Sequence, residues 1–418
     1  MPMILLKNIL HGNARTNILI DDEGRIGRIG PLVGEVPGAE MVDCSRLAVI
    51  PGLVNMHTHA AMILLRGIHE DLTLYDWLNN IWKIEARLDR EFIYWSTKAA
   101  GLEMIRSGTT TFNDQYWFCP HARQAALEMG VRPVVSFIFL DSHNPELARK
   151  QREACQRLYE RTLEWGPESQ FAISIHSVYT VCKENIVWAN QFALDHGLKV
   201  HLHLSETKVE NEDCRRAHGG LSPTEYFEQL GIWGPHVIAA HCLHLSDEDV
   251  RILGEHHVNC VHNIHSNLKL ASGYRFRYNE LRDAGVNVCI GTDGASSAND
   301  MDMLAHMKTA AIMQKAWRSD PLAMPLQELL DCATVHGAKA LGIDSGVIRE
   351  GAWADLVLLD LDNSYFLSPG SVTANLIYAA GSRAVSSVMV RGKWVMREGV
   401  IPNEAEILSG ARKVLSQI

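Results

Sequence analysis

The sequence predicts an α/β fold, a (β/α)8 TIM barrel with a small composite β-sandwich domain formed from both termini. Short apolar runs alternate with longer segments of helical period, and this alternation repeats eight times in the middle of the chain. Both ends read instead as short strands separated by polar turns. Repeated strand and helix units form parallel sheets, and eight strands that are apolar along their length favour a closed barrel. We expect the barrel over residues 51–345 and the composite domain over 1–50 plus 346–418.

The terminal segments carry the pattern of a β-meander, in which consecutive strands are joined by turns. Near the N-terminus we expect strands over 4–9, 17–20 and 26–29. Near the C-terminus, ADLVLLDLD covers 354–362, and 386–399 reads as two strands across an Arg391-Gly392 turn. The two ends can therefore share one small β-domain.

The middle of the chain supplies the eight expected barrel strands. They are LVNMHTH (53–59), TTTFND (109–114), VRPVVSFIFL (131–140), FAISIHSVY (171–179), KVHLHLSE (199–206), HVIAAHCLH (236–244), VNCVHNIHS (258–266) and VNVCIGTDG (286–294). Helix-like segments such as ENIVWANQFALDHG separate them, several ending in glycine as helices commonly do. An open doubly wound sheet is the structural alternative, but Gly24, Gly27 and Gly30 have the wrong spacing for its phosphate-binding loop.

Composition narrows the classes of partner and compartment. The chain is 47% apolar and 21% charged, as folded globular proteins are, and its net charge of −10 comes without a basic block. This balance argues against nucleic acid or an anionic membrane as partner. Nine cysteines at irregular spacings, without a C-x-x-C pair, indicate a reducing compartment. With no secretory h-region and no apolar stretch of membrane-spanning length, we expect a cytoplasmic protein.

Histidine and aspartate recur where the expected strands end. His57 and His59 are two residues apart on the first strand and so point the same way, while His203, His241 and Asp293 end the fifth, sixth and eighth strands. The carboxyl ends of barrel strands form the face that carries active sites. Imidazole and carboxylate ligands suit zinc or ferrous iron. A single histidine here would more often be a hydrogen-bonded core residue, but convergence at one face favours a metal site.

Three further side chains extend this hypothesis. Glu206 follows the fifth strand and can exchange a proton with a leaving group, although a solvated loop carboxylate is its ordinary interpretation. His201 lies one step deeper than His203 and is interpreted as packing or outer-shell support. The fourth strand offers His176 and no lysine.

The motifs PGLVNMHTH, HLHLSET, AHCLH, HNIHSNLKLASG and IGTDGASS together resemble the amidohydrolase superfamily, in particular its mononuclear aminohydrolase branch. Within that branch the sequence is most similar to the 5-methylthioadenosine/S-adenosylhomocysteine deaminase family. The motifs occur in family order over about residues 51–345, and H-x-H alone would be a weak signal. Barrels of this kind with two metals commonly bridge them through a carboxylated lysine on the fourth strand, so its absence here favours one metal.

The resemblance implies a set of roles. His57, His59, His203 and Asp293 would bind one divalent ion, zinc first and iron second, while His241 polarises the hydrolytic water. Glu206 would deliver a proton to the purine ring and Asp293 would take one from the water. The product would be the inosine analogue plus ammonia. Family members are commonly homo-oligomers, which makes a homo-oligomer a possibility for this chain.

The resemblance also implies residues that bind the substrate. The segment after the first strand matches the family pattern W-L…I-E-x-R-L, so Trp77 would pack on the nucleoside and Glu85 would accept hydrogen bonds from the ribose, with His176 as a further contact. Their ordinary interpretations are a core aromatic, a solvated helix face and a buried histidine. Two features depart from the family. Ile264-His265 replaces the expected Pro-x, and no arginine is assigned to a substrate carboxylate, although Arg149, Arg152 and Arg157 lie nearby in sequence.

The leading functional hypothesis is hydrolytic deamination of 5′-methylthioadenosine, S-adenosylhomocysteine or adenosine. A second keeps the metal site but takes a free heterocycle such as guanine, 8-oxoguanine, a pterin or a triazine. Glu85 discriminates between the two substrate hypotheses, because a free base has no ribose hydroxyl groups for this carboxylate to bind. A third hypothesis is a non-enzymatic scaffold. It is disfavoured because such proteins have typically lost metal-ligating residues, whereas this chain retains all of them.

Overall fold

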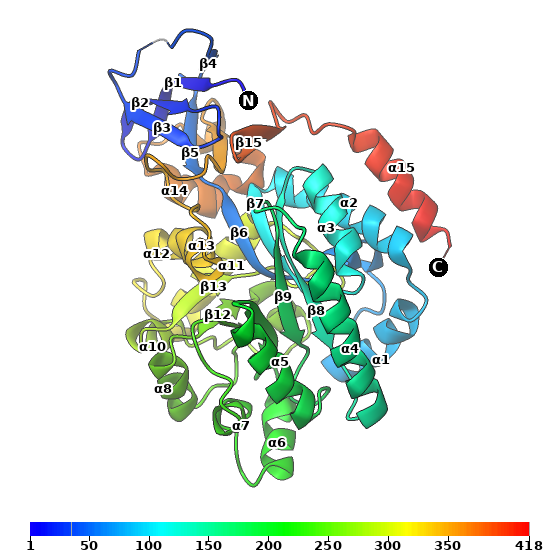
Figure 1. Cartoon of the computed structure of the whole chain (residues 1–418). Coiled ribbons are helices and arrows are strands. Elements are labelled where there is room, and N and C mark those ends of the chain that lie inside the picture. Colours follow the sequence, from blue (N-terminus) through cyan, green and yellow to red (C-terminus); the bar gives the residue numbers. More distant parts are fainter. Residues whose placement is uncertain (35, 418) are drawn as a thin grey trace.

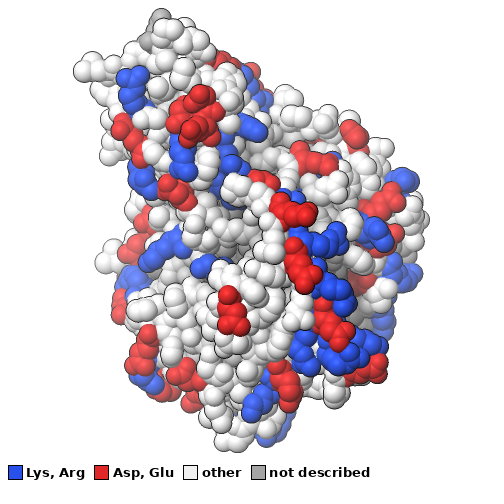
Figure 2. Space-filling model, in the orientation of Figure 1, with Lys and Arg blue, Asp and Glu red and all other residues white. Residues whose placement is uncertain are grey.

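Two sheets organise the chain, a central parallel barrel and a mixed sheet at one end that joins the two termini (Figure 1). The computed structural model describes residues 1–34 and 36–417. No helix among these residues has the length and apolar character needed to cross a membrane. On the face drawn in Figure 2, acidic and basic side chains are interspersed.

The barrel consists of eight strands, each hydrogen-bonded in parallel to the next in chain order. They are β6 (Leu53–Thr58), β7 (Thr109–Asp114), β8 (Arg132–Phe139), β9 (Gln170–Ile175), β10 (Lys199–Leu204), β11 (Val237–His241), β12 (Asn259–His262) and β13 (Asn287–Ile290). All eight strands expected from the sequence are present. Nearly all their residues are buried because both faces of a parallel sheet are covered.

Side chains and loop backbone connect the first and last barrel strands. The Asn55 amide donates to the Thr292 hydroxyl at 2.7 Å, and the Asp293 backbone N–H donates to the His57 carbonyl at 2.9 Å. These bonds bring the end of β13 beside the end of β6 and make the barrel nearly closed.

Helices surround the barrel (Figure 1). They are α1 (Leu74–Glu85), α2 (Arg90–Arg106), α3 (Cys119–Glu128), α4 (Pro145–Thr162), α5 (Lys183–Asp195), α6 (Lys208–Ala217), α7 (Pro223–Gln229), α8 (Asp247–Glu255), α9 (Ile264–Lys269), α10 (Tyr278–Asp283), α11 (Met303–Arg318), α12 (Leu326–Cys332) and α13 (Val335–Leu341). Several begin at an N-cap that the sequence encodes. Ser246, for example, accepts from the Asp249 backbone N–H while the Asp249 carboxylate accepts from Ser246, which satisfies two N-terminal donors of α8.

The mixed sheet combines both ends of the chain in the order β16-β15-β14-β5-β1-β2-β3, with β4 also paired to β1. Its strands are β1 (Ile4–His11), β2 (Ala14–Ile20), β3 (Ile26–Gly30), β4 (Glu40–Asp43), β5 (Leu47–Pro51), β14 (Leu356–Asp360), β15 (Val385–Val390) and β16 (Lys393–Met396). The β15–β16 turn lies at Arg391 and Gly392, as expected, and both have positive φ. Leu6, Ile18 and Leu356 belong to its own apolar core.

The C-terminal segment returns from this sheet to the barrel. A short helix, α14 (Val372–Asn375), precedes β15, and the last helix, α15 (Glu404–Leu415), packs along α2 (Figure 1). Arg106 of α2 pairs with Glu404 at 2.6 Å, and Gly410 lies against the Trp95 ring. One terminal element therefore covers the barrel rather than the mixed sheet.

Candidate active site

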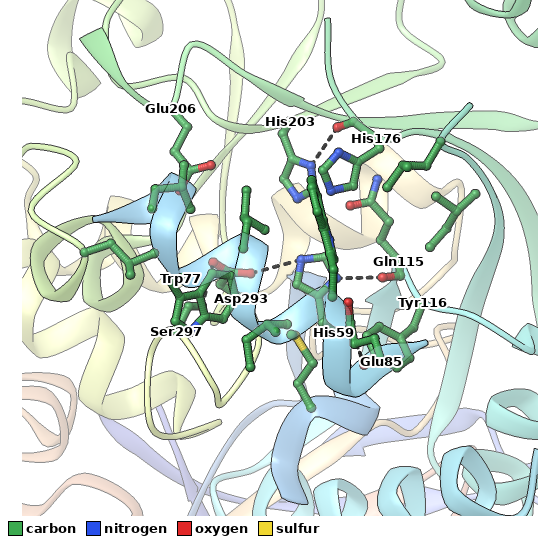
Figure 3. Close-up of a pocket in the computed structure, with 18 of the residues that line it drawn as sticks. His59, Trp77, Glu85, Gln115, Tyr116, His176, His203, Glu206, Asp293 and Ser297 are labelled. Atoms are coloured by element: carbon green, nitrogen blue, oxygen red, sulfur yellow. Dashed lines mark hydrogen bonds and ion pairs between the residues drawn. The ribbon is translucent and has the colours of Figure 1, made fainter. Parts of the chain in front are cut away.

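Five side chains that the sequence places at strand ends meet at the carboxyl edge of the barrel. His57 lies near the end of β6 and His59 just beyond it, His203 and His241 lie at the ends of β10 and β11, and Asp293 follows β13. Nε2 of His57 and Nε2 of His59 lie 3.3 and 3.2 Å from the same Asp293 oxygen, Oδ1. Figure 3 shows His59, His203 and Asp293 directed toward one space.

The ligand atoms form two overlapping triads that could each hold a metal ion. One comprises His57, His59 and Asp293, and the other His57, His203 and His241, with all ligand atoms of a triad within 4.8 Å of one another. His57 belongs to both. A single ion near His57 Nε2 is therefore within reach of the whole set.

The orientation of the four imidazoles fits metal binding. Each uses Nδ1 for a protein partner: His59 to the Gln115 carbonyl at 2.6 Å, His203 to the His176 carbonyl at 2.7 Å, His241 to the Asn267 amide oxygen at 2.9 Å, and His57 to His201 Nε2 at 2.8 Å. A ring that donates from Nδ1 keeps a lone pair on Nε2, the usual arrangement in metal-ligating histidines. His57 Nε2 is buried without a hydrogen-bond partner among the described residues.

Burial and the Asp293 carboxylate together set the protonation of the site. Burial lowers the pKa of His57 to about 4 and holds that of His203 well below its usual value, so these rings are neutral at pH 7. Burial alone would raise the pKa of Asp293, but the neighbouring His57 and His59 hold it well below its usual range. Burial alone would lower the pKa of His59, but hydrogen bonding and charge from Asp293 raise it to about 9. A divalent cation that displaces this proton would meet neutral imidazole nitrogens and an ionised carboxylate, the donor set that it requires.

Local backbone geometry fixes the position of Asp293. Its Oδ1 accepts from the Gly294 backbone N–H at 2.8 Å, and its Oδ2 accepts from the Ser297 hydroxyl at 3.0 Å. Asp293 and His241 both have positive φ, 63° and 72°. Non-glycine residues rarely adopt this conformation, and such strain is concentrated at functional sites.

Glu206 lies beside this cluster at the end of the loop that follows β10. Its Oε2 is 3.7 Å from His241 Nε2, and the side chain is buried. Burial, with a smaller contribution from the Asp293 charge, raises the pKa of Glu206 to about 8. The carboxylate of Glu210 accepts the backbone N–H groups of Ser205 and Glu206 at 3.0 and 2.7 Å, which holds the loop in place. Glu206 can therefore present a protonated carboxyl group at neutral pH.

The cluster forms the inner end of a cavity that the expected substrate residues also line. Glu85 lines it and accepts from the Tyr116 hydroxyl at 2.6 Å, and burial raises the Glu85 pKa (Figure 3). Trp77 is buried there with its indole N–H unpartnered among the described residues. His176, whose Nδ1 is 2.9 Å from the Thr180 hydroxyl, completes the group.

Several residues that support the site were not singled out from the sequence. Gln115, Asn267 and Ser297 contact His59, His241 and Asp293, and Tyr116 contacts Glu85. Asn267 and Ser297 lie in or next to the motifs SNLKLASG and IGTDGASS, so position in a motif was an available signal. Gln115 and Tyr116 follow directly on β7, and only the spatial neighbourhood of β6 and β7 identifies them.

The comparisons with known proteins agree with this geometry. The family model described as "Amidohydrolase family" matches residues 48–395. A "5'-deoxyadenosine deaminase" of Methanospirillum hungatei is 40% identical over 97% of this chain and 91% of its own length. A "5-methylthioadenosine/S-adenosylhomocysteine deaminase 1" of Archaeoglobus fulgidus is 40% identical over 97% and 96%. The crystal structure of an adenosine deaminase from Xanthomonas campestris with bound zinc superimposes with a TM-score of 0.92 at 31% identity, covering 99% of each chain.

Proposed function

The chain belongs to the amidohydrolase family, and from this premise we propose that it hydrolytically deaminates an adenine-type nucleoside, namely 5′-methylthioadenosine, S-adenosylhomocysteine or adenosine. Water adds to C6 of the purine, the bond from C6 to the exocyclic nitrogen breaks, and ammonia leaves with the inosine analogue as product. The observation that carries the proposal is that metal-binding side chains, Glu206 and Glu85 line one cavity.

The enzyme uses a divalent metal, which we propose is zinc, with iron as the alternative. His57, His59, His203 and Asp293 would hold it, because their free nitrogen and carboxylate atoms converge and His57 Nε2 lacks another partner among the described residues. When bound, such an ion lowers the pKa of water toward neutrality and so supplies a nucleophile.

The protein's own groups move the protons. Glu206, with its raised pKa, would donate a proton to the ring nitrogen next to C6 as the carbon becomes tetrahedral. Asp293 would accept a proton from the attacking water. His241 donates from Nδ1 to Asn267, so its Nε2 can accept a hydrogen bond from that water and orient it.

Groups farther along the cavity would hold the nucleoside. Glu85 can accept hydrogen bonds from the ribose hydroxyls, and the unpartnered indole N–H of Trp77 can donate to an acceptor on the substrate. His176 would contribute a further polar contact. Glu85 favours a nucleoside over guanine, a pterin or a triazine as substrate, because a bare base offers no hydroxyl groups to this carboxylate.

The direct test is incubation of the metal-loaded protein with each nucleoside and each free heterocycle. We expect ammonia release with the absorbance change from adenine to hypoxanthine, and metal analysis should give about one equivalent per chain. Glu85→Ala should lower kcat/KM for nucleosides at least tenfold. Turnover of free heterocycles alone, unaffected by Glu85→Ala, would overturn the nucleoside proposal.

A further inference from the structure

An outer compartment borders the cavity at Glu85. Its lining residues are Trp82, Glu85, Ala86, Leu88, Trp117, Phe118 and Leu140. Four of these, Trp82, Glu85, Trp117 and Leu140, also line the inner cavity. The shared residues show that the two spaces adjoin each other, and their lining runs from the metal-binding cluster, by Glu85, to Phe118, which is 46% exposed.

The position of Glu85 between the metal-binding cluster and the outer compartment determines which part of a nucleoside enters that compartment. If C6 of the purine lies at the metal-binding cluster and the ribose lies at Glu85, then the substituent on C5′ points away from the base, into the outer compartment. This step rests on the function proposed above. The chemistry of the outer wall then selects among 5′ substituents.

The outer wall is apolar apart from Glu85. Among the described residues that line the two compartments there is no lysine or arginine. His176 lines the inner cavity and not the outer compartment, and its ring lies 6.2 Å from the Trp82 ring. Of the three arginines of α4 that lie near in sequence, Arg149 pairs with Glu153 and Arg152 donates to Asn185 at 2.7 Å, while Arg157 is exposed and lines neither compartment.

We propose that this outer compartment is a specificity site for uncharged, apolar 5′ substituents, so that the enzyme prefers 5′-alkylthio-5′-deoxyadenosines to S-adenosylhomocysteine. The amino-acid tail of S-adenosylhomocysteine carries an ammonium and a carboxylate group. The wall offers no cation to this carboxylate, which would lie near the carboxylate of Glu85. The charged groups of the tail would also lose part of their hydration beside Trp117 and Phe118, and no polar side chain there compensates for that loss. An alkyl tail instead buries apolar surface there.

The test is a comparison of kcat/KM for adenosine, the 5′-methylthio, 5′-ethylthio and 5′-propylthio analogues, and S-adenosylhomocysteine, using the metal-loaded full chain. Each added methylene should raise kcat/KM about 2- to 4-fold until the compartment is full. The kcat/KM for S-adenosylhomocysteine should be at least tenfold lower than that for the propylthio analogue. A flat alkyl series together with S-adenosylhomocysteine within threefold of the propylthio analogue would overturn the inference.

Two variants place a cation in the compartment. Leu140→Arg and the more exposed Phe118→Arg should each reduce the ratio of kcat/KM for the propylthio analogue to kcat/KM for S-adenosylhomocysteine at least fivefold. Leu147→Arg, the same change at an exposed position of α4 outside the cavity, should leave it unchanged. An unchanged ratio in both folded variants would count against the compartment as the determinant. Absence of ammonia from adenosine and from every analogue would instead refute the proposed function itself.

Discussion

At the scale of single residues, the candidate site depends on which ring nitrogen each histidine leaves free. His59, His203 and His241 direct Nδ1 to oxygen acceptors on neighbouring strands or helices, and His57 directs it to His201. These outward bonds orient the rings before any ligand arrives, so the site is preorganised. The sequence predicted which histidines would converge, from their strand-end positions. It did not predict the partners of His59 and His203, because these are backbone carbonyls, which carry no sequence signal.

Replacing Glu206 tests the proton donor separately from metal binding. Glu206→Gln keeps the size of the side chain but removes the acid, so kcat for nucleoside deamination should fall about 10²- to 10⁴-fold. Metal content, measured by elemental analysis, should stay at the wild-type value. Glu212→Gln on α6, an exposed carboxylate paired with Lys208, is the matched control and should retain activity. Loss of metal in Glu206→Gln would contradict the assigned role.

His265, where the chain departs from the family pattern, has a structural partner in this molecule. Its Nδ1 lies 3.0 Å from Asp300 Oδ2, and His306 Nε2 lies 3.0 Å from Asp300 Oδ1. The three residues connect α9, the loop after β13 and the start of α11. Burial alone would raise the Asp300 pKa, but the hydrogen bonds from His265 and His306 lower it below its usual value.

This arrangement predicts a pH-dependent contribution to stability. Because the pKa of Asp300 is lower in the folded than in the unfolded chain, its stabilisation is fully present above about pH 4 and is lost as the pH falls further. Asp300→Asn should lower the free energy of unfolding at pH 7 by about 1–3 kcal/mol. The difference in Tm between variant and wild type should shrink toward pH 3. A constant difference, or an equal effect from the exposed Asp283→Asn, would contradict this account.

At the scale of elements, strand ends rather than helices position the chemistry. The apolar runs identified all eight barrel strands, and the alternation of side chains explained why His57 and His59 share a face. The packing of helices against one another was harder to predict from the sequence. The division into a barrel over 51–345 and a composite domain over 1–50 plus 346–418 stays a prediction. The contact of α15 with α2 was not predicted, because it depends on a small residue that meets an aromatic ring over a long separation in the chain.

The contact between α15 and α2 can be tested at Gly410. A Cβ added there would lie 2.3 Å from the Trp95 ring, so Gly410→Val should displace α15. We expect a loss of about 1–3 kcal/mol in unfolding free energy and faster proteolysis of the C-terminal segment, with kcat unchanged. Ser409→Ala, on the exposed side of the same helix, should have little effect. Resistance of Gly410→Val to proteolysis at the wild-type rate would refute the packing argument.

At the scale of the whole molecule, a buried ion pair joins the barrel to the mixed sheet. Arg132 begins β8 and lies 2.5 Å from Asp355, which precedes β14, with 3% and 0% of the two side chains exposed. Asp355 also accepts from the Arg391 backbone N–H at 2.7 Å. The sequence predicted that the two termini would form one unit, but not this attachment. The cytoplasmic location and the homo-oligomeric state remain predictions.

Removing one member of this pair leaves a buried charge without its partner. Asp355→Ala should therefore cost about 3–5 kcal/mol in unfolding free energy, measured by denaturant titration. Asp213→Ala breaks an exposed pair with Arg216 and should cost less than about 1 kcal/mol. Equal costs for the two variants would mean that Arg132 is accessible to water after the change.

The bond between the Asp293 backbone and the His57 carbonyl joins the two ends of the barrel. During synthesis on the ribosome, the first ligands emerge more than two hundred residues before the last. A nascent chain therefore carries half-built sites that cannot retain an ion as the finished enzyme does, and long-range closure of this kind is slow. The nascent chain should begin to bind the ion tightly only when the barrel closes. Tight metal binding during translation would therefore report when the last folding step occurs.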